Sequence, residues 1–161
     1  MFEFLNQGCA RKVYAINDDV VIKVARYLDS TNKFAKWGVD QCKVELATYL
    51  KYGDKMPLCK IYVDMCTEER IVMERVTPLE FLPDEITEFD YITSLVSALE
   101  FEKEDAEYLD SLSPTMRRFA DKILKSGLTR QEIRDILVDV EFSNIGLKDG
   151  ELVILDYGMV G

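Results

Sequence analysis

Short apolar runs separated by turn residues fill the first half of the chain, and their length and β-branched content predict strands. The expected strands cover residues 2–5, 13–16, 20–26, 58–66 and 70–76. Asn17-Asp18-Asp19 and Thr67-Glu68-Glu69 separate two pairs of these runs, and Asn and Asp favour turns. The pattern therefore predicts a small antiparallel sheet.

Longer segments with helical periodicity interrupt and follow these strands. Residues 32–52 predict one helix, which Gly53 would end. Pro78 and Pro83 then mark a break, and a second helix is expected over about 85–102. Ser113-Pro114 has the pattern of a cap followed by the first helical residue. Thr129 and Glu132 have the spacing of a capping box for a further short helix.

The last twenty residues predict a hairpin. NIGL (144–147) and LVILDY (152–157) flank the turn Lys148-Asp149-Gly150. A sheet region followed by helices and a hairpin is an α+β arrangement. We expect one domain over residues 1–161, with a sheet lobe over 1–77 and a reduced, mostly helical lobe over 78–161.

Composition and charge narrow the possible functions. The chain has 161 residues, 48% of them hydrophobic, and a formal net charge of −10. This acidity argues against general binding to nucleic acid or to an anionic membrane surface, because such binding depends on Lys and Arg. The sequence contains no histidine, which excludes a Ser-His-Asp triad and any histidine-ligated metal. A general base must therefore be Asp, Glu, Lys or Tyr.

The remaining bulk features predict a cytoplasmic protein. The four cysteines show no CxxC spacing and are interpreted as reduced structural residues. The acidic start MFEFLNQG does not have the pattern of a signal peptide. No apolar run approaches the length of roughly 20 residues that a membrane span needs.

Five polar residues in a fixed order carry the candidate chemistry. Lys23 lies in VVIKVA on a predicted strand, and Glu45 lies in VELATYL on the following helix. Asp139 and Asn144 lie five positions apart in DVEFSN, and Asp156 begins DYG after the last strand. In this order and context the set resembles the signature of the protein kinase-like superfamily. The resemblance is closer to its divergent, atypical branch and covers nearly the whole chain.

The resemblance implies a site for ATP and Mg²⁺. Lys23 would neutralise charge on the phosphates, and Glu45 would orient Lys23 by a charge-assisted pair. Asn144 and Asp156 offer the hard oxygen ligands that Mg²⁺ prefers. Asp139 would take a proton from the attacking hydroxyl group.

Further positions complete the nucleotide site that the resemblance implies. The phosphate loop would lie in NQGCARK around its single glycine, Gly8. The carbonyl of Glu74 and the amide of Val76 would meet the adenine edge. Leu147, with Ile154, would form the apolar side of the pocket.

Three departures from the family pattern keep other functions open. Leu137-Val138 replaces the usual His-Arg before the catalytic Asp, and Glu141 stands where a Lys or Arg is usual. Three residues follow Gly158 in this sequence, and nothing in it resembles a substrate platform. We therefore weigh a minimal phosphotransferase against a nucleotide-binding pseudokinase and an acidic partner-binding protein on the same fold.

A protein substrate or a protein partner is expected in each case. A homodimer would be favoured if the reduced helical lobe exposed an apolar patch. The simpler alternative is that the candidate residues pack inside the lobe. These candidates are Phe101, Tyr108, Leu109, Leu112 and Phe119.

Overall fold

The computed structural model describes residues 2–8, 10–26, 34–82, 110, 112–138, 140 and 142–157. These residues belong to two compact units, one within residues 1–51 and 59–75 and the other within 52–58 and 76–157. An antiparallel sheet with helices confirms the predicted α+β class. The helix predicted over 85–102 lies outside the described residues, as do Asp139, Glu141 and Gly158.

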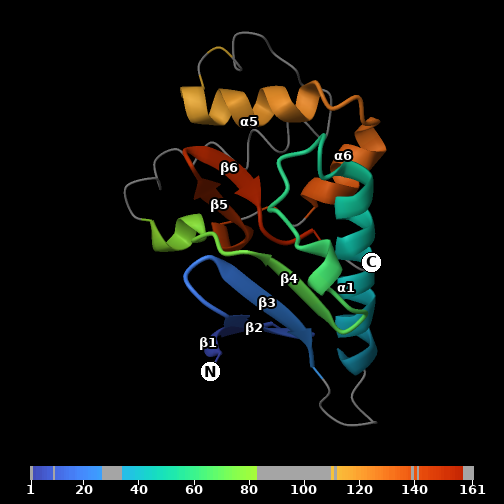
Figure 1. Cartoon of the computed structure of the whole chain (residues 1–161). Helices are drawn as coiled ribbons and strands as arrows, with labels where there is room; N and C mark the ends of the chain where they lie inside the picture. The colour runs from blue at the N-terminus through green and yellow to red at the C-terminus, as the bar shows by residue number, and fades with distance from the viewer. Residues whose placement is uncertain are drawn as a thin grey trace. The chain divides into compact units, whose positions relative to one another are not determined.

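The first unit is built on a four-stranded antiparallel sheet in the order β1-β2-β3-β4 (Figure 1). Its strands are β1 (Glu3–Gln7), β2 (Arg11–Ala15), β3 (Val20–Ala25) and β4 (Arg70–Glu74). Four of the five predicted strands are thus confirmed, with ends shifted by up to two residues. The turn at residues 16–19 sets the β2–β3 register, in which Val13 pairs with Lys23 and Arg11 pairs with Ala25.

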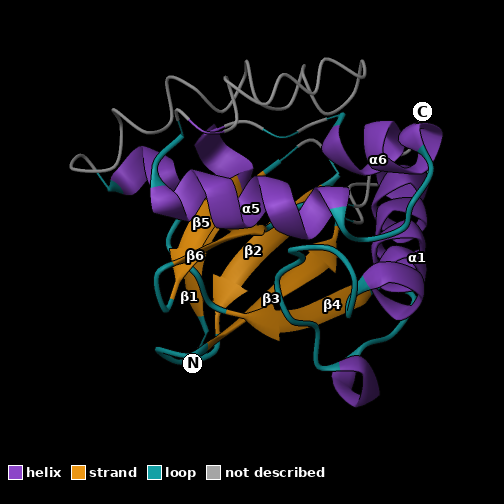
Figure 2. Ribbon diagram, turned by 90° about the horizontal axis from the view of Figure 1, so that it is seen from above, coloured by secondary structure: helices purple, strands orange, loops and turns teal. Residues whose placement is uncertain are grey.

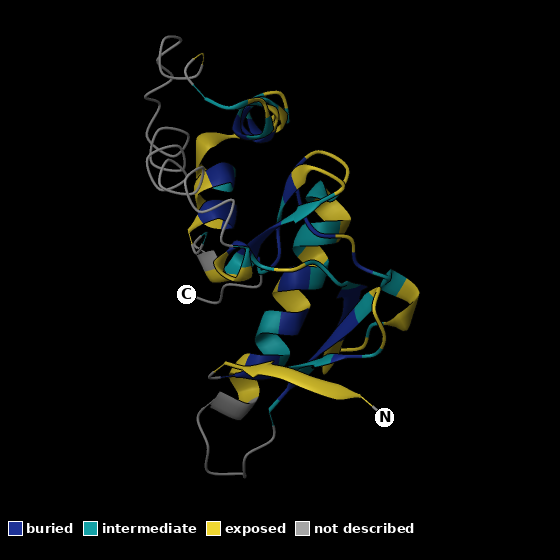
Figure 3. Ribbon diagram, turned by 90° about the vertical axis from the view of Figure 1, so that its left-hand side faces the viewer, coloured by how far each residue is buried: buried dark blue, intermediate teal, exposed yellow. Residues whose placement is uncertain are grey.

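Burial differs sharply between the strands of this sheet. Ile71, Val72 and Met73 of β4 are buried and provide much of the core of the unit. All five residues of β1 are exposed (Figure 3), and that strand pairs only with β2. Strands β3 and β4 therefore carry most of the buried part of the sheet, on which a site could be built.

Helix α1 (Phe34–Tyr52) ends where predicted, one residue before Gly53. Within the first unit it alternates buried and exposed faces along its length (Figure 3). Gly38 approaches the sheet closely, since a Cβ atom there would lie 2.4 Å from the carbonyl oxygen of Ala10 and 2.9 Å from the Cβ of Ala25. A glycine at this position allows the helix to pack directly on the ends of β2 and β3.

The prediction of a continuous strand over residues 58–66 is wrong. Only isolated bridges form there, at Leu58 and Ile61, and the chain then turns into a short 3₁₀-helix, Val63–Met65. The amide of Val72 in β4 donates to the Sγ atom of Cys66 at 3.3 Å, so a side chain takes the position of a ladder carbonyl. Because the Cys66 thiol accepts this hydrogen bond, the buried amide of Val72 is satisfied without a neighbouring strand at this position.

The second unit holds the predicted hairpin. Its strands are β5 (Ile145–Lys148) and β6 (Glu151–Ile154), joined by Asp149 and Gly150. Both turn residues have positive φ, of 51° and 79°, which a two-residue type I′ turn requires and which an Asp-Gly pair supplies. Helix α5 (Pro114–Leu124) packs on β6; it lies beside the hairpin in Figure 1 and passes over it in the view of Figure 2.

Both predicted helix starts in this unit are confirmed. Ser113 caps α5 by accepting a hydrogen bond from the amide of Met116, and Pro114 is the first helical residue. Thr129 and Glu132 form the complete capping box of α6 (Arg130–Leu137). Phe119 of α5 is buried, so it packs inside the unit, and Leu112 is half-buried. The other three residues of the suggested dimer patch lie outside the described segments.

Tyr52 connects to the capping box of α6 within the second unit. Its hydroxyl donates to Oε2 of Glu132, whose Oε1 accepts from the amide of Thr129 at 3.0 Å. We expect Tyr52→Phe to lower the free energy of unfolding by about 1–1.5 kcal/mol, because it removes one hydrogen bond to a charged acceptor. Urea denaturation would measure this change.

Gln131→Ala, which removes an exposed hydrogen bond to Asp135, is the control for Tyr52→Phe and should cost less than about 0.5 kcal/mol. Equal costs for both variants would contradict the prediction.

The search for membrane spans gives a negative result. Within the described segments, no helix combines the length and the apolar character that crossing a bilayer requires.

Candidate functional site

The predicted pairing of Lys23 with Glu45 is present in the first unit. Nζ of Lys23, on β3, lies 2.7 Å from Oε1 of Glu45, on α1. Glu45 is 0% exposed and Lys23 is 7% exposed. Both groups are therefore removed from bulk water, where a charge-assisted hydrogen bond is strong and a missing partner is costly. A flexible lysine ammonium group is held in one place by this arrangement.

A third residue, Arg11, joins Lys23 and Glu45 in a buried cluster and was not predicted from the sequence. Nη1 of Arg11, on β2, lies 2.5 Å from Oε2 of Glu45, and Arg11 is 5% exposed. The sequence contains a signal for this contact, because a turn centred on Asp18 would pair residue 11 with residue 25. Arg11 and Lys23 are then diagonal neighbours on one face of the sheet. Arg11, Lys23 and Glu45 together form the buried ionic cluster.

Cys42 borders the buried ionic cluster one helical turn before Glu45. Its Sγ atom lies 4.0 Å from Nη1 of Arg11. Burial raises the pKa of the Cys42 thiol above its ordinary value, and the nearby guanidinium of Arg11 offsets part of this effect. Burial likewise raises the pKa of Cys66. Both residues are therefore neutral thiols at physiological pH, in agreement with a structural role.

The predicted phosphate loop forms a defined turn around Gly8. The amide of Gly8 donates to the carbonyl of Arg11 at 2.9 Å, and Nη1 of Arg26 donates to the carbonyl of Gly8 at 2.9 Å. A Cβ atom at residue 8 would meet only ordinary contact, 3.8 Å from the carbonyl oxygen of Arg11. Packing against the described residues thus does not require glycine here.

The segment around Glu74, predicted to meet an adenine edge, is held by backbone bonds. The amide of Glu74 donates to the carbonyl of Lys60 at 2.9 Å, and that of Arg75 to the carbonyl of Asp19 at 2.8 Å. The carbonyl of Glu74 accepts from the thiol of Cys59 at 3.3 Å. Val76 is half-buried, in the second unit.

The two predicted metal ligands lie at the same end of the β5–β6 hairpin. Ile145 pairs with Ile154, and the amide of Leu155 donates to the carbonyl of Asn144 at 2.7 Å. The pairing therefore continues by one residue, which places Asn144 opposite Leu155 and beside the start of Asp156. Both side chains are half-buried. Their amide and carboxylate oxygens fit Mg²⁺, which takes one or two protein ligands and completes its shell with water and phosphate.

The two residues predicted for the apolar side of the pocket differ in how exposed they are. Leu147 on β5 is half-buried, whereas Ile154 on β6 is completely buried, so only Leu147 is accessible to a ligand. Asp139, the predicted base, lies outside the described residues. Among the residues that are described, no three or more His, Cys, Asp or Glu side chains gather in a way that could hold a metal ion.

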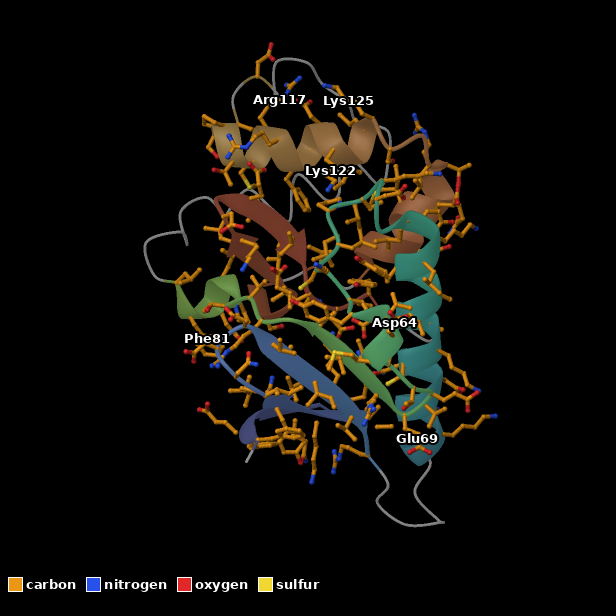
Figure 4. The ribbon with its side chains drawn as sticks, in the orientation of Figure 1. Asp64, Glu69, Phe81, Arg117, Lys122 and Lys125 are labelled. Atoms are coloured by element: carbon orange, nitrogen blue, oxygen red, sulfur yellow. The ribbon has the colours of Figure 1, made fainter. Side chains whose placement is uncertain are left out.

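Charge is unevenly distributed in this acidic chain. Residues 114–125 contain four basic residues and one acidic residue. Arg117, Lys122 and Lys125 all project from α5 or its last turn (Figure 4). Arg118 pairs with Glu151 at 2.6 Å, and Arg117 pairs with Asp121 at 3.0 Å. Helix α5 is therefore a locally basic segment of an acidic chain.

Comparison with models of protein families finds no matching family, and comparison with curated proteins finds no matching relative.

Proposed function

We propose that the protein is an ATP-dependent phosphotransferase of a minimal, kinase-like type. The observation that carries the proposal is the buried pair of Lys23 and Glu45, 2.7 Å apart, between the third sheet strand and the helix that follows it. A buried lysine held by a carboxylate is costly to maintain and adds little stability compared with apolar residues. Its presence favours a role in binding an anion such as a nucleotide phosphate.

The proposal assigns one role to each group. Lys23 binds phosphate oxygens, Glu45 orients Lys23, and the backbone around Gly8 approaches the phosphates. Asn144 and Asp156 hold Mg²⁺, which would neutralise charge developing on the phosphates. Asp139 accepts the proton of the attacking hydroxyl group. The carbonyl of Glu74, the amide of Val76 and the side chain of Leu147 contact the base.

The first test is calorimetric titration of Mg-ATP into the wild type and into Asp156→Ala. We expect the wild type to bind, and the variant, or the wild type with EDTA, to bind about tenfold or more weakly, a loss of about 1.4 kcal/mol or more. Asp149→Asn is the matched control. It removes a carboxylate from the turn of the same hairpin, and Asn tolerates the positive φ of 51° found there. Failure of the wild type to bind at millimolar ATP would overturn the proposal.

A second candidate is a nucleotide-binding pseudokinase, which Glu141 in the catalytic loop favours. A carboxylate two residues after Asp139 adds negative charge where the transferred phosphoryl group would gain it. Transfer of labelled phosphate from ATP separates the two functions. Transfer that is lost in Asp139→Asn, while Mg-ATP binding persists, supports the phosphotransferase. Binding without transfer in the wild type supports the pseudokinase.

A further inference from the structure

In the buried ionic cluster, each oxygen of the Glu45 carboxylate has its own cationic partner. Oε1 of Glu45 contacts Lys23 at 2.7 Å, and Oε2 contacts Arg11 at 2.5 Å. A pair of Lys23 with Glu45 alone would leave the carboxylate able to rotate and to give both oxygens to the ammonium group. The contact with Arg11 prevents that rotation.

The sheet geometry makes the position of Arg11 specific. Arg11 is opposite Ala25 in the β2–β3 register, and Ala25 shares a face of β3 with Lys23 because side chains alternate along a strand. Gly38 of α1 packs close to Ala25, so α1 covers this face. The neighbouring cation Lys12 pairs with Val24 and belongs to the opposite face. Arg11 therefore reaches Glu45 under α1, whereas Lys12 does not share that face.

Arg11 also connects the buried ionic cluster to the turn around Gly8. The carbonyl of Arg11 accepts the hydrogen bond from the amide of Gly8, so one residue carries both contacts. The guanidinium group is planar and permanently charged, and fixes a carboxylate better than a flexible ammonium group does. A change in the Arg11 side chain is therefore transmitted to Lys23 through Glu45.

We propose that Arg11 is a positioning residue for Lys23. It fixes Glu45 so that one carboxylate oxygen faces Lys23, and Lys23 is thereby held in one orientation for contact with a phosphate. This inference rests on the proposed function, in which a nucleotide phosphate is the ligand of Lys23.

The test compares Arg11→Met, Arg11→Lys and the control Lys12→Met in the full chain. Nitrogen-15 NMR of the Lys23 ammonium group, assigned with Lys23→Arg, reports on its contact with Glu45 in the absence of nucleotide. We expect Arg11→Met to shift this signal and to weaken Mg-ATP binding about tenfold, about 1.4 kcal/mol. Arg11→Lys should restore only part of both properties, because it restores a cation but not the planar guanidinium group, and Lys12→Met should change neither. In phosphate transfer, Arg11→Met should raise KM more than it lowers kcat.

The outcomes separate this inference from the proposed function. If the wild type binds no Mg-ATP, the proposed function fails, and the Lys23 signal alone decides whether Arg11 positions it. If the wild type binds and Arg11→Met leaves both the signal and the affinity unchanged, the role of Arg11 is overturned and the proposed function stands. If Arg11→Met does not fold, Arg11→Gln, which keeps a donor and loses the charge, replaces it with the same expected shift and loss.

Discussion

Glu45→Gln should lower the free energy of unfolding by about 3–5 kcal/mol, because it leaves two buried cations without the charge of their shared carboxylate. The amide has nearly the same size as the carboxylate, so packing is preserved and only the charge is removed. Lys23 and Arg11 would then lie buried, within a few ångströms of each other, without the carboxylate that they now share. Denaturation by urea, followed by circular dichroism, would measure the change.

Glu68→Gln is the matched control for this prediction. Glu68 lies 3.8 Å from Lys43, which belongs to the same helix as Glu45, but both side chains are more than half exposed. Exposed pairs contribute little, so we expect a change within about 0.5 kcal/mol. A cost for Glu45→Gln no larger than that of Glu68→Gln would show that the buried ionic cluster is hydrated in solution.

The cost of breaking the buried ionic cluster does not make it a source of stability. Buried ion pairs often stabilise a protein less than apolar residues of similar volume would, although removal of one partner is strongly destabilising. Apolar residues could occupy these three positions under α1. Buried apolar side chains already form other parts of the core of this unit, among them Ile22, Ile71 and Met73. The presence of three charged residues under α1 is therefore consistent with the ligand-binding role proposed above.

The parts of the fold that the sequence predicts well are those set by neighbouring residues. The Asp-Gly turn requires positive φ at two adjacent positions, and few residue pairs other than Asp149-Gly150 supply it. The α6 start depends on Thr129 and Glu132, three residues apart, and the α5 start on Ser113 and Pro114. Each of these patterns lies within a few consecutive residues, and the structure forms the corresponding turn or helix start at those residues.

The features that the sequence did not predict depend on residues far apart in the chain. The strand expected over 58–66 fails because the thiol of Cys66 accepts from the amide of Val72, and no local pattern reports that exchange. The contact of Lys23 with Glu45 is also long-range; the family resemblance predicts it although no local pattern does, and the structure brings the two residues together. The loop pattern around Gly8 places Arg11 in the predicted phosphate loop, and only the strand register shows that it shares a face with Lys23.

Gly38→Ala should lower the free energy of unfolding by about 1–2 kcal/mol net, opposite in sign to the usual effect of this change inside a helix. Alanine in place of glycine normally stabilises a helix interior by about 1 kcal/mol. Here the added Cβ would lie 2.4 Å from the carbonyl oxygen of Ala10 and 3.0 Å from the Cα of Ala25, and both are backbone atoms with little freedom to move. Overpacking of this kind costs typically about 1–3 kcal/mol and occasionally more, which exceeds the gain.

The same substitution tests how the helix and the buried ionic cluster depend on each other. Gly38 and Glu45 are two helical turns apart on α1, so a helix displaced at Gly38 would draw the Glu45 carboxylate away from Arg11 and Lys23. Ala47→Gly, at an exposed position of the same helix, is the control and should cost only the propensity difference of about 1 kcal/mol. We expect Gly38→Ala to shift the Lys23 ammonium signal as well as the unfolding midpoint, and Ala47→Gly to shift the midpoint alone. A stabilised Gly38→Ala variant would show that α1 does not pack against β2 and β3 as closely as the contact at Ala10 requires.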